Sequence, residues 1–85
     1  MAGRKEFTLN VLSQEAVILY GSYEIVFVPS SHGDVAIMAF HTPMIMMMTP
    51  GKIRVRQNHK TEFVADVVSG IVYVGENEVT VLINK

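Results

Sequence analysis

The sequence predicts an all-β protein, a flattened β-sandwich of short, mostly antiparallel strands. Three observations lead to this fold class: apolar and polar residues alternate over short stretches, β-branched residues recur within them, and turn-forming residues separate them. Helical signals are almost missing, because the candidate helix cap at Ser13-Gln14-Glu15 has too little chain after it before β-type residues resume. Many short strands at close spacing favour a sandwich or barrel over a fold of alternating strands and helices.

The clearest predicted strand covers residues 52–57. Ile53 and Val55 lie on one side of an extended chain, and three basic side chains lie on the other. A helix would distribute those cations around its circumference, so the alternation indicates a half-buried strand. A polar tip at 58–60 and a returning strand at 61–66 complete a hairpin. The basic side chains are Lys52, Arg54 and Arg56, which we interpret, together with Lys60, as a solvated face.

Further strands are predicted on both sides of this hairpin. They cover residues 7–12, 16–20, 23–28, 35–40, 44–48, 67–74 and 78–83. The turns between them are expected at Gly21-Ser22 and at residues 29–34, 49–51 and 75–77, where Gly, Pro, Ser and Asn gather. Gly70 lies inside a predicted strand, which suggests a bulge or a close approach of another backbone.

The middle of the chain contains an unusual methionine-rich run. An apolar stretch at 35–40 is interrupted by His41-Thr42-Pro43, and Met44-Ile45-Met46-Met47-Met48 follows. One interpretation is two buried strands that meet at a proline-containing corner. The alternative is that part of the run lies at a protein interface, because five consecutive apolar side chains place some on the outer face and methionine adapts to surfaces that repack.

Length and composition narrow the function classes. The 85 residues fit one domain, which we expect at 7–85 after a flexible N-terminal segment at 1–6. Hydrophobic residues make up 49% of the chain and charged residues 18%, which is too apolar for disorder. The net charge of −1 gives no sequence-wide attraction to nucleic acid or anionic lipid. The chain has no cysteine, which favours a reducing compartment and excludes thiol chemistry.

The ends and the apolar stretches of the chain predict no direct contact with a membrane. The first residues are polar and lack the apolar segment of a secretory signal. The longest mostly apolar stretch, 63–74, is too short to span a bilayer. We therefore expect the protein to meet a membrane only through a partner.

Six segments in order along the chain match the pattern of one known family. No single segment is specific, but together they span nearly the whole sequence from residue 7 onward. They are the opening strand FTLNVLS at 7–13, the loop PSSHGDVAI at 29–37, the corner His41-Thr42-Pro43-Met44, the turn and strand PGKIRV at 50–55, and the closing strands VSGIVYV at 68–74 and NEVTVL at 77–82. Together these segments resemble the N-terminal β-sandwich domain of the ε subunit of F-type ATP synthases.

The resemblance implies a structural role in a rotary machine and no catalysis by this chain. Such a domain is a rotor part of the central stalk of the F1 sector, links the γ subunit to the c ring, and couples proton translocation to ATP synthesis. It binds no cofactor and is a peripheral protein on the cytoplasmic side of the bacterial plasma membrane, held there only through the complex. The resemblance implies a c-ring contact at Asp34, His41, Thr42, Pro43 and Met44, and a γ-subunit contact at Ser13, Met46 and Lys52.

The sequence departs from the family pattern at three places. Ala39-Phe40 stands where the family commonly has Pro-Gly, so we expect either a changed corner backbone or a repacked ring contact, since Phe enters glycine-type conformations only at a cost. Ile71 follows Gly70 where a second glycine is usual. The family generally continues into a C-terminal helical hairpin, so the inhibitory and ATP-binding roles of that hairpin are not assigned to residues 1–85.

An alternative from another class is a small all-β ligand-binding or metal-binding domain. His32, Asp34 and His41 would then lie at the mouth of a cup, although the sequence has no short pair of histidines at metal-ligand spacing. The carboxylates are scattered over separate turns and strands, no serine lies in a G-x-S-x-G context, and no Walker A or G-x-G-x-x-G motif occurs. A filled core with an exposed apolar patch would favour the stalk protein, and a polar-lined cavity would favour the alternative.

Overall fold

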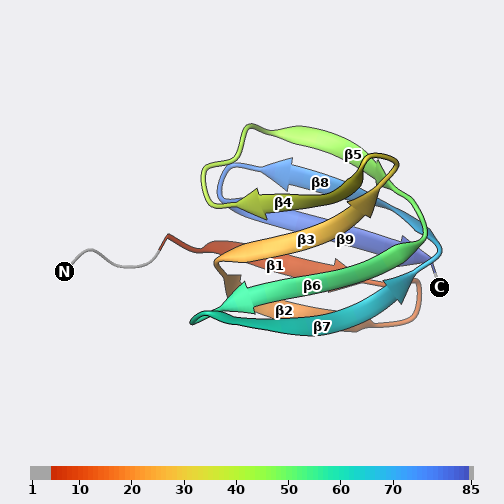
Figure 1. The fold of residues 1–85 in the computed structure, drawn as a ribbon, viewed down its shortest axis with the longest axis horizontal. Helices are drawn as coiled ribbons and strands as arrows, with labels where there is room; N and C mark the ends of the chain where they lie inside the picture. Colours follow the sequence, from red (N-terminus) through yellow and green to blue (C-terminus); the bar gives the residue numbers. More distant parts are fainter. Residues whose placement is uncertain (1–4, 85) are drawn as a thin grey trace.

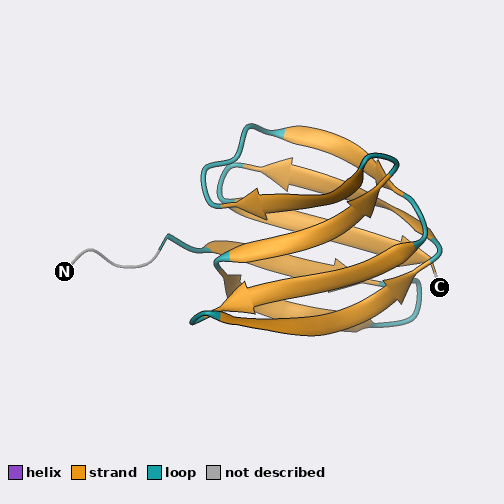
Figure 2. Ribbon diagram, in the orientation of Figure 1, coloured by secondary structure: helices purple, strands orange, loops and turns teal. Residues whose placement is uncertain are grey.

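The computed structural model describes residues 5–84, which form nine strands in two layers (Figure 1). These residues contain no helix, and short loops join the strands (Figure 2). In chain order the strands are β1 (Phe7–Leu12), β2 (Val17–Tyr23), β3 (Ile25–Ser30), β4 (Gly33–Met38), β5 (Met44–Met48), β6 (Gly51–Gln57), β7 (Lys60–Val67), β8 (Ser69–Gly75) and β9 (Glu78–Asn84). One sheet has the order β2-β1-β9-β8-β5 and the other β4-β3-β6-β7. The predicted all-β sandwich is confirmed.

The strand pairing brings the first and the last strand of the chain together within the five-stranded sheet. Strands β1 and β9 pair in parallel, whereas the other described pairs are antiparallel. The parallel pair joins the hairpin β1–β2 to the hairpin β8–β9, so the first and last strands of the chain lie side by side in the middle of one layer. Pairs so distant in sequence make the sandwich one cooperative body.

The core lies between the two sheets and is apolar throughout. Alternate side chains of each central strand point inward, as the burial pattern of β1 shows most clearly. Among the described residues, no polar or charged residue is buried. The buried side chains are Phe7, Leu9, Val11, Val26, Val28, Ile37, Met48, Ile53, Val55, Ala65, Val67, Val72, Val74, Val79, Val81 and Ile83.

Two predicted turns differ from the structure. The turn predicted at Gly21-Ser22 is wrong, because β2 continues through both residues to Tyr23. Gly21 faces the Tyr23 ring, and a Cβ atom there would lie 3.2 Å from that ring, so the glycine makes room for a neighbouring side chain. The turn predicted at 29–34 is shorter, because β3 runs to Ser30 and β4 begins at Gly33. The Ser30 hydroxyl donates to the Gly33 carbonyl at 2.7 Å and closes this tight hairpin.

Other local predictions are confirmed. Asn58 and His59 form the tip between β6 and β7, both with positive φ, as a two-residue hairpin turn requires. Gly70 is a site of close backbone approach, since a Cβ atom there would lie 2.2 Å from the Leu82 carbonyl oxygen.

The predicted N-terminal segment 1–6 lies largely outside the described residues, which begin at residue 5. Of its described part, Glu6 accepts a hydrogen bond from Gln57 Nε2 at 2.6 Å.

Candidate protein-interaction surface

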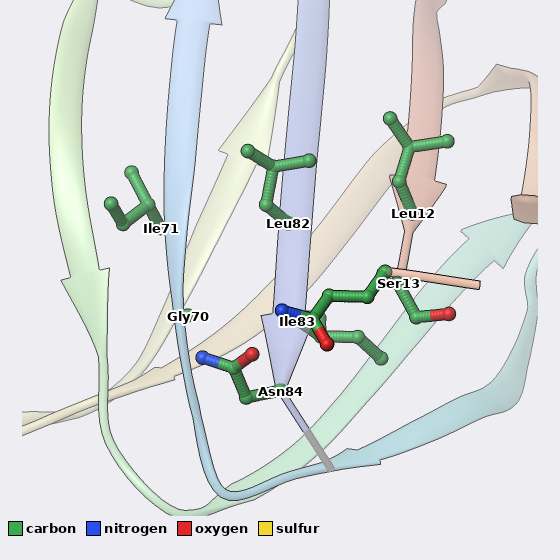
Figure 3. Close-up of a pocket in the computed structure, with 8 residues that line it drawn as sticks. Leu12, Ser13, Gly70, Ile71, Leu82, Ile83 and Asn84 are labelled. Carbon is green, nitrogen blue, oxygen red and sulfur yellow. The ribbon is translucent and has the colours of Figure 1, made fainter. Parts of the chain in front are cut away.

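The outer face of the five-stranded sheet carries a continuous apolar row. In the strand register, Met47 lies opposite Ile71, Ile71 opposite Leu82, and Leu82 opposite Leu12. Leu12 in turn lies opposite Val17, so the row crosses all five strands of this sheet. Figure 3 shows Ile71, Leu82 and Leu12 side by side on neighbouring strands. Cross-strand neighbours of this kind form one surface and not separate apolar points.

A second row enlarges the patch. Ile45 lies opposite Tyr73, and Tyr20 lies three strands further on, beyond the polar residues Thr80 and Asn10. Ile45 is 70% exposed. We call the two rows together the outer apolar face. Its members are Leu12, Val17, Tyr20, Ile45, Met47, Ile71, Tyr73 and Leu82.

Charge is nearly absent from this side of the molecule. Among the described strand residues, alternation places a single charged side chain on the outside of the five-stranded sheet. This is Glu78, the first residue of β9. Exposed apolar side chains that touch one another and lack interspersed charges mark protein-interaction sites more often than scattered ones do. The outer apolar face therefore has the composition of a surface that a partner covers.

The outside of the four-stranded sheet carries charged side chains, four of them in two ion pairs, beside exposed apolar ones such as Met38 and Phe63. Lys52 Nζ lies 2.8 Å from Asp66 Oδ1, and Arg54 forms an ion pair with Asp34. The same cations also lie over aromatic rings, Lys52 at 5.2 Å from the centre of the Phe63 ring. Lys52 and Arg54, two of the basic residues predicted to form a solvated face, are thus ion-paired at the surface. The two outer sides differ mainly in charge, which is frequent on the four-stranded sheet and nearly absent from the five-stranded one.

The structure separates the residues that the resemblance assigns to the γ contact. Ser13 lies at the end of the outer apolar face, beside a shallow hollow of about 210 Å³ that Leu12 and Leu82 also line (Figure 3). Met46 is half-buried and packs inward against the core. Lys52 lies on the charged face, in its ion pair. These three residues do not share one face, and their assignment to γ stays a prediction.

The residues assigned to the c ring lie at the two ends of β4. Asp34 is the second residue of that strand, whereas His41, Thr42 and Pro43 follow its last residue. A strand of this length separates the two positions by about 20 Å. The His41 ring lies with Nδ1 at 2.7 Å from the Thr42 carbonyl oxygen, and Met44 packs inward against the core. A single contact that includes both ends has to run lengthwise along β4.

The corner between β4 and β5 contains a strained residue that sequence reasoning singled out only as a departure. Phe40 has a φ of 63°, the left-handed conformation that glycine adopts most easily, and its side chain is 71% exposed. Phe40 thus takes a glycine-type conformation itself, and the two outcomes expected for this corner, a changed backbone or a repacked ring contact, stay predictions. The ring stands over a hollow beside His41 and Pro43, with Lys5 Nζ 5.9 Å from its centre.

The exposed members of the outer apolar face were not predicted one by one. The run Met44–Met48 contains no polar residue, so its alternation has no visible phase in the sequence. Pairing with β8 sets the phase, because Met46 and Met48 lie opposite Val72 and Gly70 and point inward with them. The prediction that part of the run faces outward is confirmed, with Ile45 and Met47 as the outward residues.

The residues proposed for a metal cup do not gather. His32 and Asp34 lie at the hairpin between β3 and β4, and His41 lies beyond the far end of β4. Across residues 5–84, no three His, Cys, Asp or Glu side chains are grouped so that they can hold a metal ion. In the same part of the chain, no helix is present that has the length and hydropathy to cross a membrane.

A two-layer β-sandwich whose five-stranded sheet has a largely uncharged, apolar outer side is typical of one class of protein, the small domains that bind a larger partner. The sequence model of the "ATP synthase, Delta/Epsilon chain, beta-sandwich domain" matches residues 6–85. The chain belongs to this family.

Curated relatives and solved structures agree with the assignment. An ATP synthase epsilon chain of Desulfitobacterium hafniense is 39% identical over 82 residues, which are 96% of this chain and 60% of the relative. An ATP synthase epsilon chain of Nitrosococcus oceani is 34% identical over 74 residues, which are 87% of this chain and 53% of the relative. The chain therefore spans little more than half the length of the curated relatives it matches.

Two electron cryo-microscopy structures share the fold. One is of the Euglena gracilis mitochondrial ATP synthase, with OSCP, F1 and c-ring; a chain in it matches with a TM-score of 0.86 and 17% identity, over 95% of this chain and 52% of that one. The other is of the central stalk and c-ring of the Tetrahymena thermophila mitochondrial ATP synthase, with a TM-score of 0.75 and 10% identity, over 99% of this chain and 67% of that one. At these identities the likeness concerns the fold.

Proposed function

We propose that this chain is a non-catalytic rotor part of the central stalk of an F-type ATP synthase. It links the γ subunit to the c ring and so couples proton translocation to ATP synthesis. It works on the cytoplasmic side of a bacterial plasma membrane, which it meets only through the complex. The single observation that carries the proposal is the outer apolar face, in a chain whose curated relatives are ATP synthase epsilon chains.

The outer apolar face fits a large protein partner. Five strands spaced by about 4.8 Å, each with about six residues at 3.3 Å per residue, give the whole outer side of this sheet an area of roughly 500 Å², of which the two apolar rows are a part. A partner that covers it buries roughly 1,000 Å² when both surfaces are counted, which is the lower limit of a specific interface. The dry, uncharged middle of this face is the expected core of such an interface, with polar residues such as Ser13 at its rim.

We assign this face to γ and the neighbouring β4 edge to the c ring. Strands β4 and β5 are edge strands of different sheets, and the corner at 39–43 joins them. Asp34 and the corner, which the resemblance assigns to the ring, both flank β4. A rigid sandwich that holds two partners on adjoining sides transmits torque between them without chemistry of its own.

The test is a titration of the intact chain with purified γ by calorimetry. We expect Ile45→Lys to weaken binding at least tenfold, because γ would bury an unpaired charge on the outer apolar face. The matched control is Met38→Lys, which places the same charge at an outward position of the other sheet, opposite Ile25. Binding unchanged by Ile45→Lys, or no binding by the original chain, would reject the proposed γ contact.

A further inference from the structure

The methionines of the described chain differ sharply in exposure. Met47 is 75% exposed, Met38 is 52% exposed, and Met48 is 4% exposed. Met44 and Met46 are half-buried against the core. Met47 is therefore the methionine whose thioether is most open to solvent in this part of the molecule, and its neighbour in the chain is among the least open.

Exposure decides how fast a thioether reacts with a peroxide. The sulfur lone pair attacks one peroxide oxygen, the O–O bond breaks, and an S–O bond forms. The sulfur is oxidised by two electrons, and the peroxide is reduced to water or an alcohol. Since the chain contains no cysteine, no thiol of its own competes for the oxidant.

The position of Met47 gives this reaction a consequence. Met47 lies on the outer apolar face opposite Ile71, two residues along β5 from Ile45. Neither isoleucine side chain has a hydrogen-bond donor, so they leave a sulfoxide oxygen unpaired once a partner excludes water. Oxidation thus turns a flexible apolar contact into a polar one at the edge of the face.

We propose that Met47 is a peroxide-modification site that controls association with γ. The inference rests on the proposed function, because it assigns the outer apolar face to that partner. In the free chain Met47 is open to the oxidant, and in the complex γ covers it. An oxidised chain is then excluded from assembly until a methionine sulfoxide reductase returns the thioether, with two electrons from a thiol and release of the oxygen as water, while an assembled chain is protected.

The first experiment needs no partner. The intact chain is treated with hydrogen peroxide, and the oxidised positions are located over time by tandem mass spectrometry. We expect the order of oxidation to be Met47, then Met38, then Met44 and Met46, with Met48 last. Oxidation of Met48 as fast as Met47 would overturn the modification site, whatever γ does.

The second experiment measures binding of γ before and after oxidation. We expect the dissociation constant of the oxidised chain to be roughly ten- to hundredfold larger, because binding buries an unpaired polar oxygen. Met47→Leu has no thioether at this position, so whatever its own starting affinity, its dissociation constants before and after peroxide treatment should agree within about threefold. Met38→Leu, on the other sheet, should remain sensitive.

The outcomes separate the two proposals. If the untreated chain fails to bind γ, the proposed function is wrong, and with it the control of assembly. If the untreated chain binds and the chain oxidised at Met47 binds equally well, the proposed function stands and the inference about Met47 is overturned. Sensitivity that persists in Met47→Leu would also overturn it.

Discussion

At the scale of single residues, Phe40 has a left-handed backbone conformation that an aromatic residue disfavours. A left-handed φ costs a residue with a Cβ atom about 1–2 kcal/mol, and here it is occupied by an aromatic residue with little burial in return. Such strain is usually kept where a site requires it. The neighbours His41 and Pro43 belong to the corner that the resemblance assigns to the ring.

Two substitutions separate the effect of this backbone strain from the effect of losing the aromatic ring of Phe40. Phe40→Ala and Phe40→Gly both remove the aromatic side chain and its contact with Lys5. Only the glycine relieves the left-handed backbone, while it adds entropy to the unfolded chain. We expect the glycine variant to exceed the alanine variant by about 1 kcal/mol in free energy of unfolding, measured in urea. An alanine variant as stable as the glycine variant would show that the corner is not strained.

At the scale of elements, the five residues of β5 point alternately toward the core and toward the outer apolar face. Met48 points into the core and Met47 points out, although the two side chains are chemically identical. We expect Met48→Ala to lower the free energy of unfolding by about 2–5 kcal/mol, as for other buried methionines. Met47→Ala should change it by less than about 0.5 kcal/mol. Thermal or urea unfolding of the two variants checks the phase of the strand, and equal losses would contradict it.

The same strand shows what sequence reasoning can reach. Where polar residues alternate with apolar ones, as in β6, the strand and its buried side follow from the pattern alone. In Met44–Met48 no polar residue marks the outer side, and the pairing partner β8 fixes it instead. The turn predicted at Gly21 is wrong for a related reason. This glycine leaves room for the Tyr23 ring, and the local sequence does not show that contact.

The candidate interaction surface, too, could be predicted from the sequence only in part. An outward-facing part of the methionine run was predicted from the run itself, because a small domain cannot bury every apolar side chain. The face that it joins was not predicted, since Leu12, Ile71 and Leu82 come from strands far apart in sequence and meet only through register. Sequence patterns indicate which residues suit an interface, whereas the topology decides which of them share one.

At the scale of the whole molecule, the proposed function requires two partners on adjoining sides of the sandwich. The outer apolar face ends at β5, and β4 lies across the corner from it in the other sheet. With γ on the face and the ring along β4, the corner at 39–43 stands between them. This arrangement requires the ring contact to extend over the length of β4, because Asp34 and Thr42 lie at its two ends.

Cysteine cross-linking tests that orientation directly, because the chain has no cysteine of its own. Asp34→Cys and Thr42→Cys each place one thiol at an exposed position at one end of β4. In assembled complexes whose ring carries cysteines in its exposed loops, we expect both variants to form disulfides with the ring, since both ends of β4 then lie within disulfide reach of it. Glu62→Cys, at an exposed position of β7 on the opposite edge of the same sheet, is the control and should not react. Reaction of only one variant would mean that the sandwich stands on the ring by one end, and the lengthwise contact would then be wrong.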